Sequence, residues 1–225
     1  MMQLSQIKTT GTLSEKTYEI LKMAIIQLEL KPGELITVED ISEQLGVSRT
    51  PIRTALNSLI NDGLIEMIPG KGTFVKGLSQ KEASDLLSVR ELLECYSVKL
   101  AAELRTEEDL KHLEYVLYRT EFTYRGHYKN NQEFLSYDSE FHEAIVKISN
   151  NSYLEKQLSM ILDNCRRYLN ATTFEKIIPD VLDEHKELYE QIRIQDASAA
   201  ELCMQKHIKN IKNRMIYYIS LNENT

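Results

Sequence analysis

The chain has 225 residues, of which 42% are apolar, and a formal net charge of −7. That length can bury one or two hydrophobic cores, while the net acidity argues against a general nucleic-acid coat protein. Residues 1–11 lack an apolar stretch and no run approaches membrane-spanning length, so we expect neither a signal peptide nor a transmembrane helix. The odd, widely spaced cysteines Cys95, Cys165 and Cys203 indicate reduced thiols in a cytoplasmic protein.

Residues 37–75 have the pattern of a short helix, a tight turn, a second helix and a hairpin. Thr37 is expected to open the first helix, with Asp40 three residues later to complete a capping box. Gly46 is expected to end that helix, and Ser48 is a good N-cap for the next one. The pattern therefore predicts two short helices joined by a tight turn.

The second of these helices combines an apolar face with a cationic start. Arg49 and Arg53 lie four residues apart and share one exposed face, which suits an approach to phosphates and base edges in a major groove. Residues 64–75 read as a hairpin whose glycines permit close approach to a groove and whose Lys71 supplies charge to a phosphate. Together these elements predict a winged helix-turn-helix. The alternative is a small helical domain with a surface hairpin and no role in DNA binding.

Here the chain closely resembles the GntR superfamily of bacterial transcription regulators. The phrases that carry the resemblance, in the family's order, are Lys31-Pro32-Gly33-Glu34, Val47-Ser48-Arg49-Thr50-Pro51-Ile52-Arg53, Ala55-Leu56, Leu59, Gly63-Leu64-Ile65 and Gly70-Lys71-Gly72-Thr73-Phe74-Val75. By that resemblance the principal DNA contacts are Arg49, Thr50, Arg53 and Gly72. Some relatives carry an arginine early in the first helix of the motif, and the acidic run Val38-Glu39-Asp40 departs from them. Thr54 also stands where many relatives have glutamate.

A domain boundary is expected near residues 76–79, where Ser79 and Glu82 form another capping box. From there almost every segment has helical period, near 80–104, 107–126, 131–149, 151–171, 178–194 and 197–220. The predicted fold is therefore mainly α. It has a winged helix-turn-helix in residues 1–77 and an all-α bundle of about six helices in residues 78–225.

Inside the predicted bundle, one apolar helical stripe is interrupted by Asp138 and His142, four residues apart. A buried carboxylate is costly unless it is paired, so Asp138 needs a partner. His185 and His207 occupy similar places on two other helices, and the four side chains together suit Zn²⁺, Ni²⁺ or a similar divalent ion. The alternative for each histidine alone is an ordinary hydrogen bond in the core. His112 and His127 belong to no such pair and are left out.

The bundle segment also resembles a known domain, the ligand-binding FCD domain of the FadR-like branch of GntR regulators. The matching residues are Arg90-Glu91-Leu92-Leu93-Glu94, Ala101-Ala102, Asp138, His142, Asn151, Glu184-His185, Asp196, Ala200 and His207. The resemblance implies a metal held by Asp138, His142, His185 and His207, with a small carboxylate effector at or near it. Arg90 could then pair bidentately with the effector, or form a salt bridge with Glu94 instead. Arg166 and Arg167 are further candidates for the effector.

These features predict a cytoplasmic homodimeric repressor that binds pseudo-palindromic operator DNA and responds to a small carboxylate metabolite. Two alternatives remain open at this point. The bundle could be a metal sensor or a dimerisation module only, or the metal could serve a hydrolase, since Glu143 and Glu184 adjoin ligands in sequence. Adjacent helix positions point about 100° apart, however, and the chain has no phosphate loop, nucleophile elbow or dinucleotide motif. We therefore expect a regulator rather than an enzyme.

Overall fold

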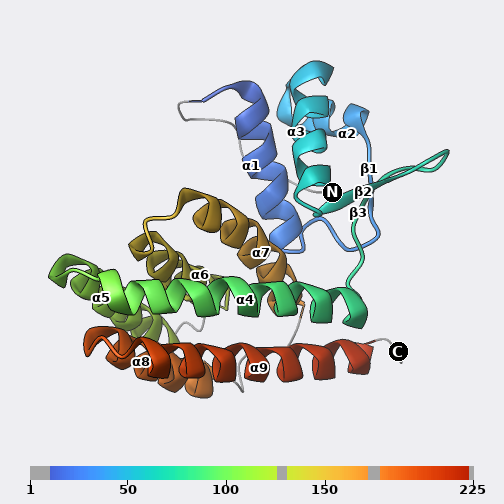
Figure 1. Ribbon diagram of the computed structural model, residues 1–225. Coiled ribbons are helices and arrows are strands. Elements are labelled where there is room, and N and C mark those ends of the chain that lie inside the picture. The colour runs from blue at the N-terminus through green and yellow to red at the C-terminus, as the bar shows by residue number, and fades with distance from the viewer. Residues whose placement is uncertain (1–10, 126–130, 172–177, 223–225) are drawn as a thin grey trace. The chain divides into compact units, whose positions relative to one another are not determined.

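The computed structural model describes residues 11–125, 131–171 and 178–222 (Figure 1). The chain divides into two compact units, Met1–Leu78 and Ser79–Thr225. The observed architecture confirms the predicted fold class, a winged helix-turn-helix followed by an all-helical unit. Among the described residues, no helix combines the length and apolarity needed to span a bilayer.

The N-terminal unit contains three helices and a small antiparallel sheet within its described residues. Its elements are α1 (Leu13–Ile26), β1 (Leu35–Ile36), α2 (Val38–Leu45), α3 (Arg49–Asn61), β2 (Ile65–Ile68) and β3 (Gly72–Val75). The strand order is β1-β3-β2, and the β2–β3 hairpin is the wing. The sequence pattern predicts α2, α3 and the wing but not α1 or β1. A full capping box between Thr12 and Glu15 marks the start of α1.

The core of this unit is built from the apolar faces of all its elements. Its buried members include Leu21, Ile25, Ile36, Ile41, Val47, Ile52, Leu56, Leu59, Leu64, Ile65 and Val75. Thr37 caps α2 by accepting a hydrogen bond from the Asp40 N–H, but the Asp40 carboxylate accepts from the Thr37 hydroxyl rather than from its backbone. Ser48 occupies the N-cap of α3 without making the side-chain hydrogen bond. Gly46 ends α2 at φ 64°, where a left-handed residue is required.

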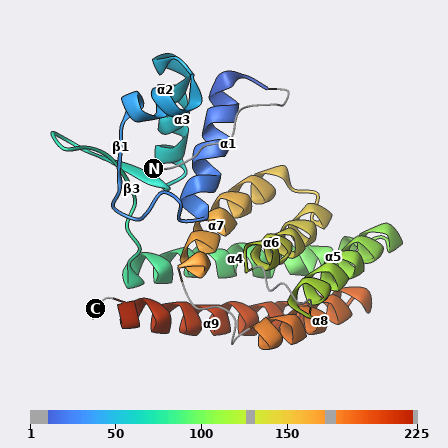
Figure 2. The same cartoon turned by 180° about the vertical axis from the view of Figure 1, so that it is seen from behind.

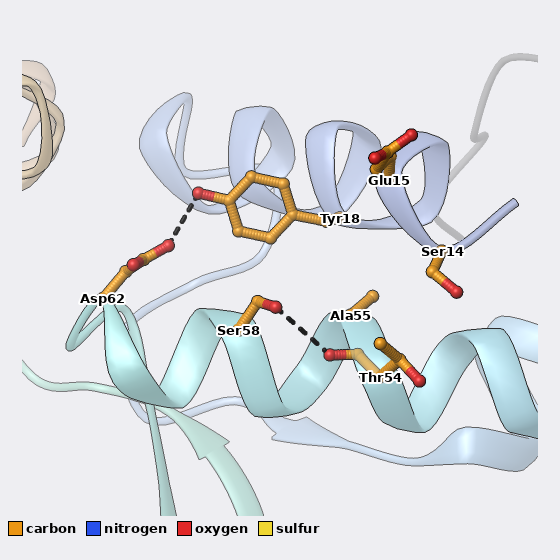
Figure 3. Close-up of a pocket in the computed structure, with 7 residues that line it drawn as sticks. All are labelled: Ser14, Glu15, Tyr18, Thr54, Ala55, Ser58 and Asp62. Carbon is orange, nitrogen blue, oxygen red and sulfur yellow. Dashed lines mark hydrogen bonds between the residues drawn. The ribbon is translucent and has the colours of Figure 1, made fainter. Parts of the chain in front are cut away.

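Helices α1 and α3 are joined by a polar contact at one end of a shallow groove (Figure 3). The Tyr18 hydroxyl on α1 donates to Asp62 Oδ2 at the end of α3, over 2.6 Å. Along the same groove, Ser58 donates its hydroxyl proton to the Thr54 carbonyl, one turn earlier. Thr54 is thus a groove residue of the first unit, and its exposed hydroxyl donates to the Thr50 carbonyl.

The C-terminal unit is entirely helical within its described residues. Its helices are α4 (Gln80–Leu104), α5 (Glu107–Arg125), α6 (Asn131–Ile148), α7 (Ser152–Asn170), α8 (Ile178–Arg193) and α9 (Ala197–Asn222). Helices α4 and α9 lie side by side in both views (Figures 1 and 2), and α6, α7 and α8 each pack on α4. The observed bounds agree with the predicted helices to within two residues at each end.

Helix caps explain most of these starting points. Thr106 and Asp109 form a complete capping box at the start of α5, and Asp196 accepts the Ala199 N–H at the start of α9. Ser79 also accepts the Glu82 N–H, but the carboxylate of Glu82 instead accepts a hydrogen bond from the Tyr168 hydroxyl of α7. A tertiary contact has thus replaced the second half of the expected capping box.

The left-handed residue between α2 and α3 gives a direct test of the helix-turn-helix geometry. Replacing Gly46 with alanine should destabilise the N-terminal unit by about 1–2 kcal/mol, because an L-residue is strained at this φ although a methyl group would meet no atom within 4 Å. Amide hydrogens of α2 and α3 should then exchange roughly 5- to 30-fold faster in hydrogen-exchange mass spectrometry. Gly77→Ala is the matched control, since that position has no positive φ and open space around it. Equal protection in both variants would contradict this assignment.

Candidate functional site

Three buried histidines from three different helices meet inside the C-terminal unit. His142 lies on α6, His185 on α8 and His207 on α9, and all three side chains are fully buried. One ring nitrogen from each lies within 4.8 Å of the others. The ring centroids of His185 and His207 are 4.8 Å apart, and those of His142 and His207 are 5.2 Å apart. Residues separated by up to 65 positions in the chain therefore present their nitrogens to one small volume.

Asp138 lies beside this cluster rather than within it. It is one turn before His142 on α6 and almost completely buried. Its Oδ1 atom is 3.7 Å from Nε2 of His185, which is too far for a hydrogen bond. The structure thus brings all four predicted metal-binding side chains into one neighbourhood, with the three imidazoles as its tightest part.

Two carboxylates contact the Nδ1 atoms of two of the imidazoles. Glu94 of α4 contacts Nδ1 of His142, and Glu184 Oε2 lies 2.7 Å from Nδ1 of His207. A carboxylate can only accept, so in the neutral imidazoles Nδ1 carries the proton and Nε2 keeps its lone pair. The two Nε2 atoms nevertheless face each other at 3.3 Å. A shared proton or a metal ion relieves such an opposition of lone pairs, and the three imidazoles together fit a metal ion.

His185 supports the same interpretation because its buried ring nitrogens lack hydrogen-bond partners among the described residues. Neither of its ring nitrogens has a hydrogen-bond partner among the described residues, although the ring stacks on Phe141 at 4.5 Å. Burial lowers the pKa of His185 well below 6.5, and His207 and His142 add to that effect. The ring is therefore neutral at pH 7 with a free lone pair. A buried polar atom left without a partner costs about 1–3 kcal/mol, which a metal ion would remove.

Arg90 completes a chain of contacts that begins at His142. Its Nε atom donates to Glu94 Oε1 over 2.5 Å, and both side chains are buried. Burial alone would raise the pKa of the Glu94 carboxyl, but Arg90 and then His142 outweigh burial and hold that pKa at about 2. The salt bridge that was one of two alternatives for Arg90 is thus present. Its Nη2 atom has no hydrogen-bond partner among the described residues.

Glu184 is fixed in turn by residues of α9. Its Oε1 accepts a hydrogen bond from Asn210 over 2.7 Å and lies 3.3 Å from the guanidinium of Arg214. Burial favours a higher pKa for Glu184, but the contact with His207 and its other partners lower it below its ordinary value. From the sequence, Glu184 is part of the FCD resemblance and adjoins a ligand in the hydrolase alternative. The structure instead places it behind His207, on the side away from the other imidazoles.

The other histidines and arginines weighed for this unit, where the structure describes them, lie outside the histidine cluster. His112 is exposed on α5, and His127 lies outside the described residues. Arg167 is fully buried on α7, where burial lowers its pKa, while its neighbour Arg166 is partly exposed. Burial also raises the pKa of the Cys165 thiol to about 11, so this cysteine is a protonated thiol beside the site.

The predicted DNA-binding residues all lie at the surface of the N-terminal unit. Arg49, Thr50 and Arg53 are exposed in the first turns of α3, and Lys71 and Gly72 are exposed at the tip of the wing. Gly72 has φ 128°, and a side chain there would place its Cβ 2.9 Å from Leu35. The Arg49 guanidinium lies 3.4 Å from the Glu39 carboxylate of α2. Glu39 belongs to the acidic run that departs from some relatives, and here it forms an ion pair with α3.

Comparison with known proteins shows what the two units resemble. Residues 13–75 match the family described as bacterial regulatory proteins, gntR family, and residues 85–210 match the FCD domain. The chain is 30% identical to the HTH-type transcriptional regulator LutR of Bacillus subtilis, over 86% of this chain and 97% of that protein. It is 24% identical to the HTH-type transcriptional repressor RspR of Escherichia coli, over 92% and 90% of the two chains.

Solved structures show the same fold. McbR/YncC of E. coli superimposes with a TM-score of 0.79 over 92% of this chain and 98% of that one, at 22% sequence identity. A GntR regulator from Rhodococcus superimposes with a TM-score of 0.77 over 90% and 97% of the chains, at 20% identity. LutR, RspR and the Rhodococcus protein are described as transcription regulators. The chain therefore belongs to the GntR family of DNA-binding transcription regulators, in the branch that carries a C-terminal FCD effector domain.

Proposed function

We propose that this regulator is a cytoplasmic homodimeric repressor. Residues 1–77 would bind a pseudo-palindromic operator, and residues 78–225 would hold a divalent metal and a small carboxylate effector. The observation that carries the proposal is the pair of Nε2 atoms of His142 and His207, opposed at 3.3 Å with a carboxylate behind each ring. A metal ion between or beside these nitrogens would satisfy both of them together with the unpartnered nitrogens of His185.

The metal would be held by Asp138, His142, His185 and His207. Three neutral imidazoles and one carboxylate suit Zn²⁺ or Ni²⁺ and leave coordination positions for water or a ligand oxygen. When bound, the ion would supply a Lewis-acidic position for one oxygen of the effector carboxylate. Glu94 and Glu184 would keep two of the rings in the correct tautomer and orientation.

Arg90 is the residue that we assign to the effector. Its buried guanidinium donates from Nε to Glu94, which in turn contacts His142. The Nη2 atom has no partner among the described residues and could donate to another acceptor. A planar guanidinium matches the geometry of a carboxylate, and a charge-assisted hydrogen bond is strongest where water is excluded. The effector would therefore connect the metal to α4 through Arg90.

In the N-terminal unit, α3 would enter the major groove and the wing would contact the adjacent backbone. Arg49, Thr50 and Arg53 are suited to this because they are exposed together at the start of one helix. Lys71 would pair with a phosphate while Gly72 lets the wing approach closely. RspR is named as a transcriptional repressor, which supports repression as the sign of regulation. A coupling of about 1–3 kcal/mol between effector and operator would change operator affinity roughly 5- to 150-fold.

One other role of the FCD domain remains compatible with the site. If the metal alone is the signal, or serves only structure or dimerisation, no carboxylate would add to its effect. The described donor cluster contains three imidazoles and no nucleophile aligned with a base, and the relatives are regulators. We therefore do not assign a hydrolytic reaction to this site.

The metal site is tested by replacing one ligand. His185→Ala should reduce zinc affinity by more than the roughly 10- to 100-fold expected when only a hydrogen-bonding partner of a ligand is changed. Glu94→Gln, which changes such a partner of His142, should fall within that range. Both are measured as zinc retained per chain after loading and desalting, with circular dichroism to check folding.

His112→Ala is the matched control, because it removes an exposed histidine from the same unit. Its zinc content should equal that of the unchanged protein. Full zinc retention by the His185 variant would remove that residue from the site.

The effector is tested by thermal unfolding with a panel of small mono- and dicarboxylates, with zinc and with a chelator. An acid present at about 100 times its dissociation constant should stabilise the protein by roughly 2.7 kcal/mol, or several degrees in Tm. This gain should require zinc. Stabilisation by zinc alone, with no acid adding to it, would support metal sensing or a structural metal instead.

The operator contact is tested with Arg49→Ala on an operator selected from random DNA. Loss of this side chain should weaken specific binding by about 1–3 kcal/mol and reduce the dependence on salt, while zinc content stays unchanged. Arg193→Ala, which removes an exposed arginine of α8, carries the same charge change and should bind normally. Equal affinities of the two variants would refute the assignment of α3 as the recognition helix.

A further inference from the structure

Helix α4 carries an exposed apolar stripe on the face opposite the site. Val89, Leu92 and Tyr96 are 47%, 73% and 53% exposed, although all three lie in the middle of a long helix. The other face of the same turns is buried and includes Arg90 and Glu94. Large side chains so exposed along one helix face usually mark a surface that another protein covers.

The stripe continues in both directions as charged residues. Asp85, Val89, Leu92, Tyr96 and Lys99 follow one another at spacings of four, three, four and three residues. That spacing keeps all five on one narrow face, as in the seam of a helix pair that crosses at about 20°. Asp85 and Lys99 are also at the surface, with side chains 65% and 41% exposed.

We propose that this seam is an isologous dimer interface, in which α4 of one protomer packs antiparallel against α4 of a second copy with the two-fold axis at Leu92. In such an interface Leu92 faces its own copy, and Val89 lies within one residue of the level of the partner's Tyr96. Asp85 faces the partner's Lys99, about seven residues or roughly 10 Å from the axis on either side. The seam is therefore complementary to itself in both its apolar and its charged positions.

A second copy fits this surface better than an unrelated partner because the charges match only with the chain reversed. A parallel pair in register would place Asp85 against Asp85 and Lys99 against Lys99, which is destabilising. The inference rests on the proposed homodimer and adds the surface that forms it. It also connects the site to the dimer, since Arg90 and Glu94 reach the histidine cluster from the same helix that carries the seam.

Leu92→Glu tests the axis, because two buried carboxylates would face each other there. Its dimer dissociation constant, measured for the full-length protein by analytical ultracentrifugation, should rise roughly 30-fold or more. Tyr153→Glu is the control. It places the same charge at an exposed position on α7, outside the seam, and should leave the dimer unchanged. Circular dichroism and zinc content should be normal in both variants.

A charge exchange tests the antiparallel register. Asp85→Lys and Lys99→Asp should each weaken the dimer, and the double variant should restore it, because each new charge again faces its opposite on the partner. Both residues also have partners in their own chain, Lys81 and Glu201, so the thermal stability of each variant is followed separately. A parallel or unrelated interface gives no such rescue.

The possible outcomes separate this inference from the proposed function. If the unchanged protein is a monomer both free and on operator DNA, the proposed homodimer itself fails. If it is a dimer and Leu92→Glu dimerises equally well, the dimer stands and the α4 seam is overturned. If Leu92→Glu changes only thermal stability, the stripe is covered by another part of the same chain and the inference is again overturned.

Discussion

The opposed Nε2 atoms of His142 and His207 are the constraint on which the C-terminal unit depends. Each ring is fixed by a carboxylate at Nδ1, so neither can turn its proton toward the other without breaking that contact. Four helices supply these groups, Glu94 from α4, His142 from α6, Glu184 from α8 and His207 from α9. The position of each helix in the bundle is therefore tied to the same small group of nitrogens and oxygens.

Charge burial around this group is balanced pair by pair. Arg90 and Glu94 are both buried, which is tolerable because each partner compensates the other, and the low pKa of Glu94 reflects that attraction. The charge of Glu184 is compensated by Arg214, and Asn210 donates a further hydrogen bond to it. Both ring nitrogens of His185 and Nη2 of Arg90 are among the buried atoms that lack a partner within the described residues, and the proposed metal and carboxylate would satisfy them.

The sequence predicted those parts of the molecule that local pattern determines. Helical periodicity gave the bundle helices to within two residues, and Asp138 with His142 could be recognised because a four-residue spacing places both on one helix face. Glu94 at His142 and Glu184 at His207 were not assigned, since the contacts join residues 48 and 23 positions apart and depend on how helices pack. The capping box predicted for Ser79 and Glu82 is incomplete for the same reason. The Glu82 carboxylate accepts a hydrogen bond from Tyr168 of α7, a contact that depends on how the two helices pack.

Helix α4 gives the site a physical route to the rest of the regulator. It begins at Gln80, a few residues after the wing ends at Val75, so any rotation of its first turn is carried into the chain that leads to the DNA-binding unit. Its buried face contacts the histidine cluster through Glu94, and its exposed face carries the Leu92 seam. Under the proposed function, a ligand bound by Arg90 would change the balance of the Arg90–Glu94–His142 contacts, and α4 would be the two-state element that carries the change. Coupling then needs only two packings of one helix whose relative free energies differ by the 1–3 kcal/mol typical of allosteric proteins.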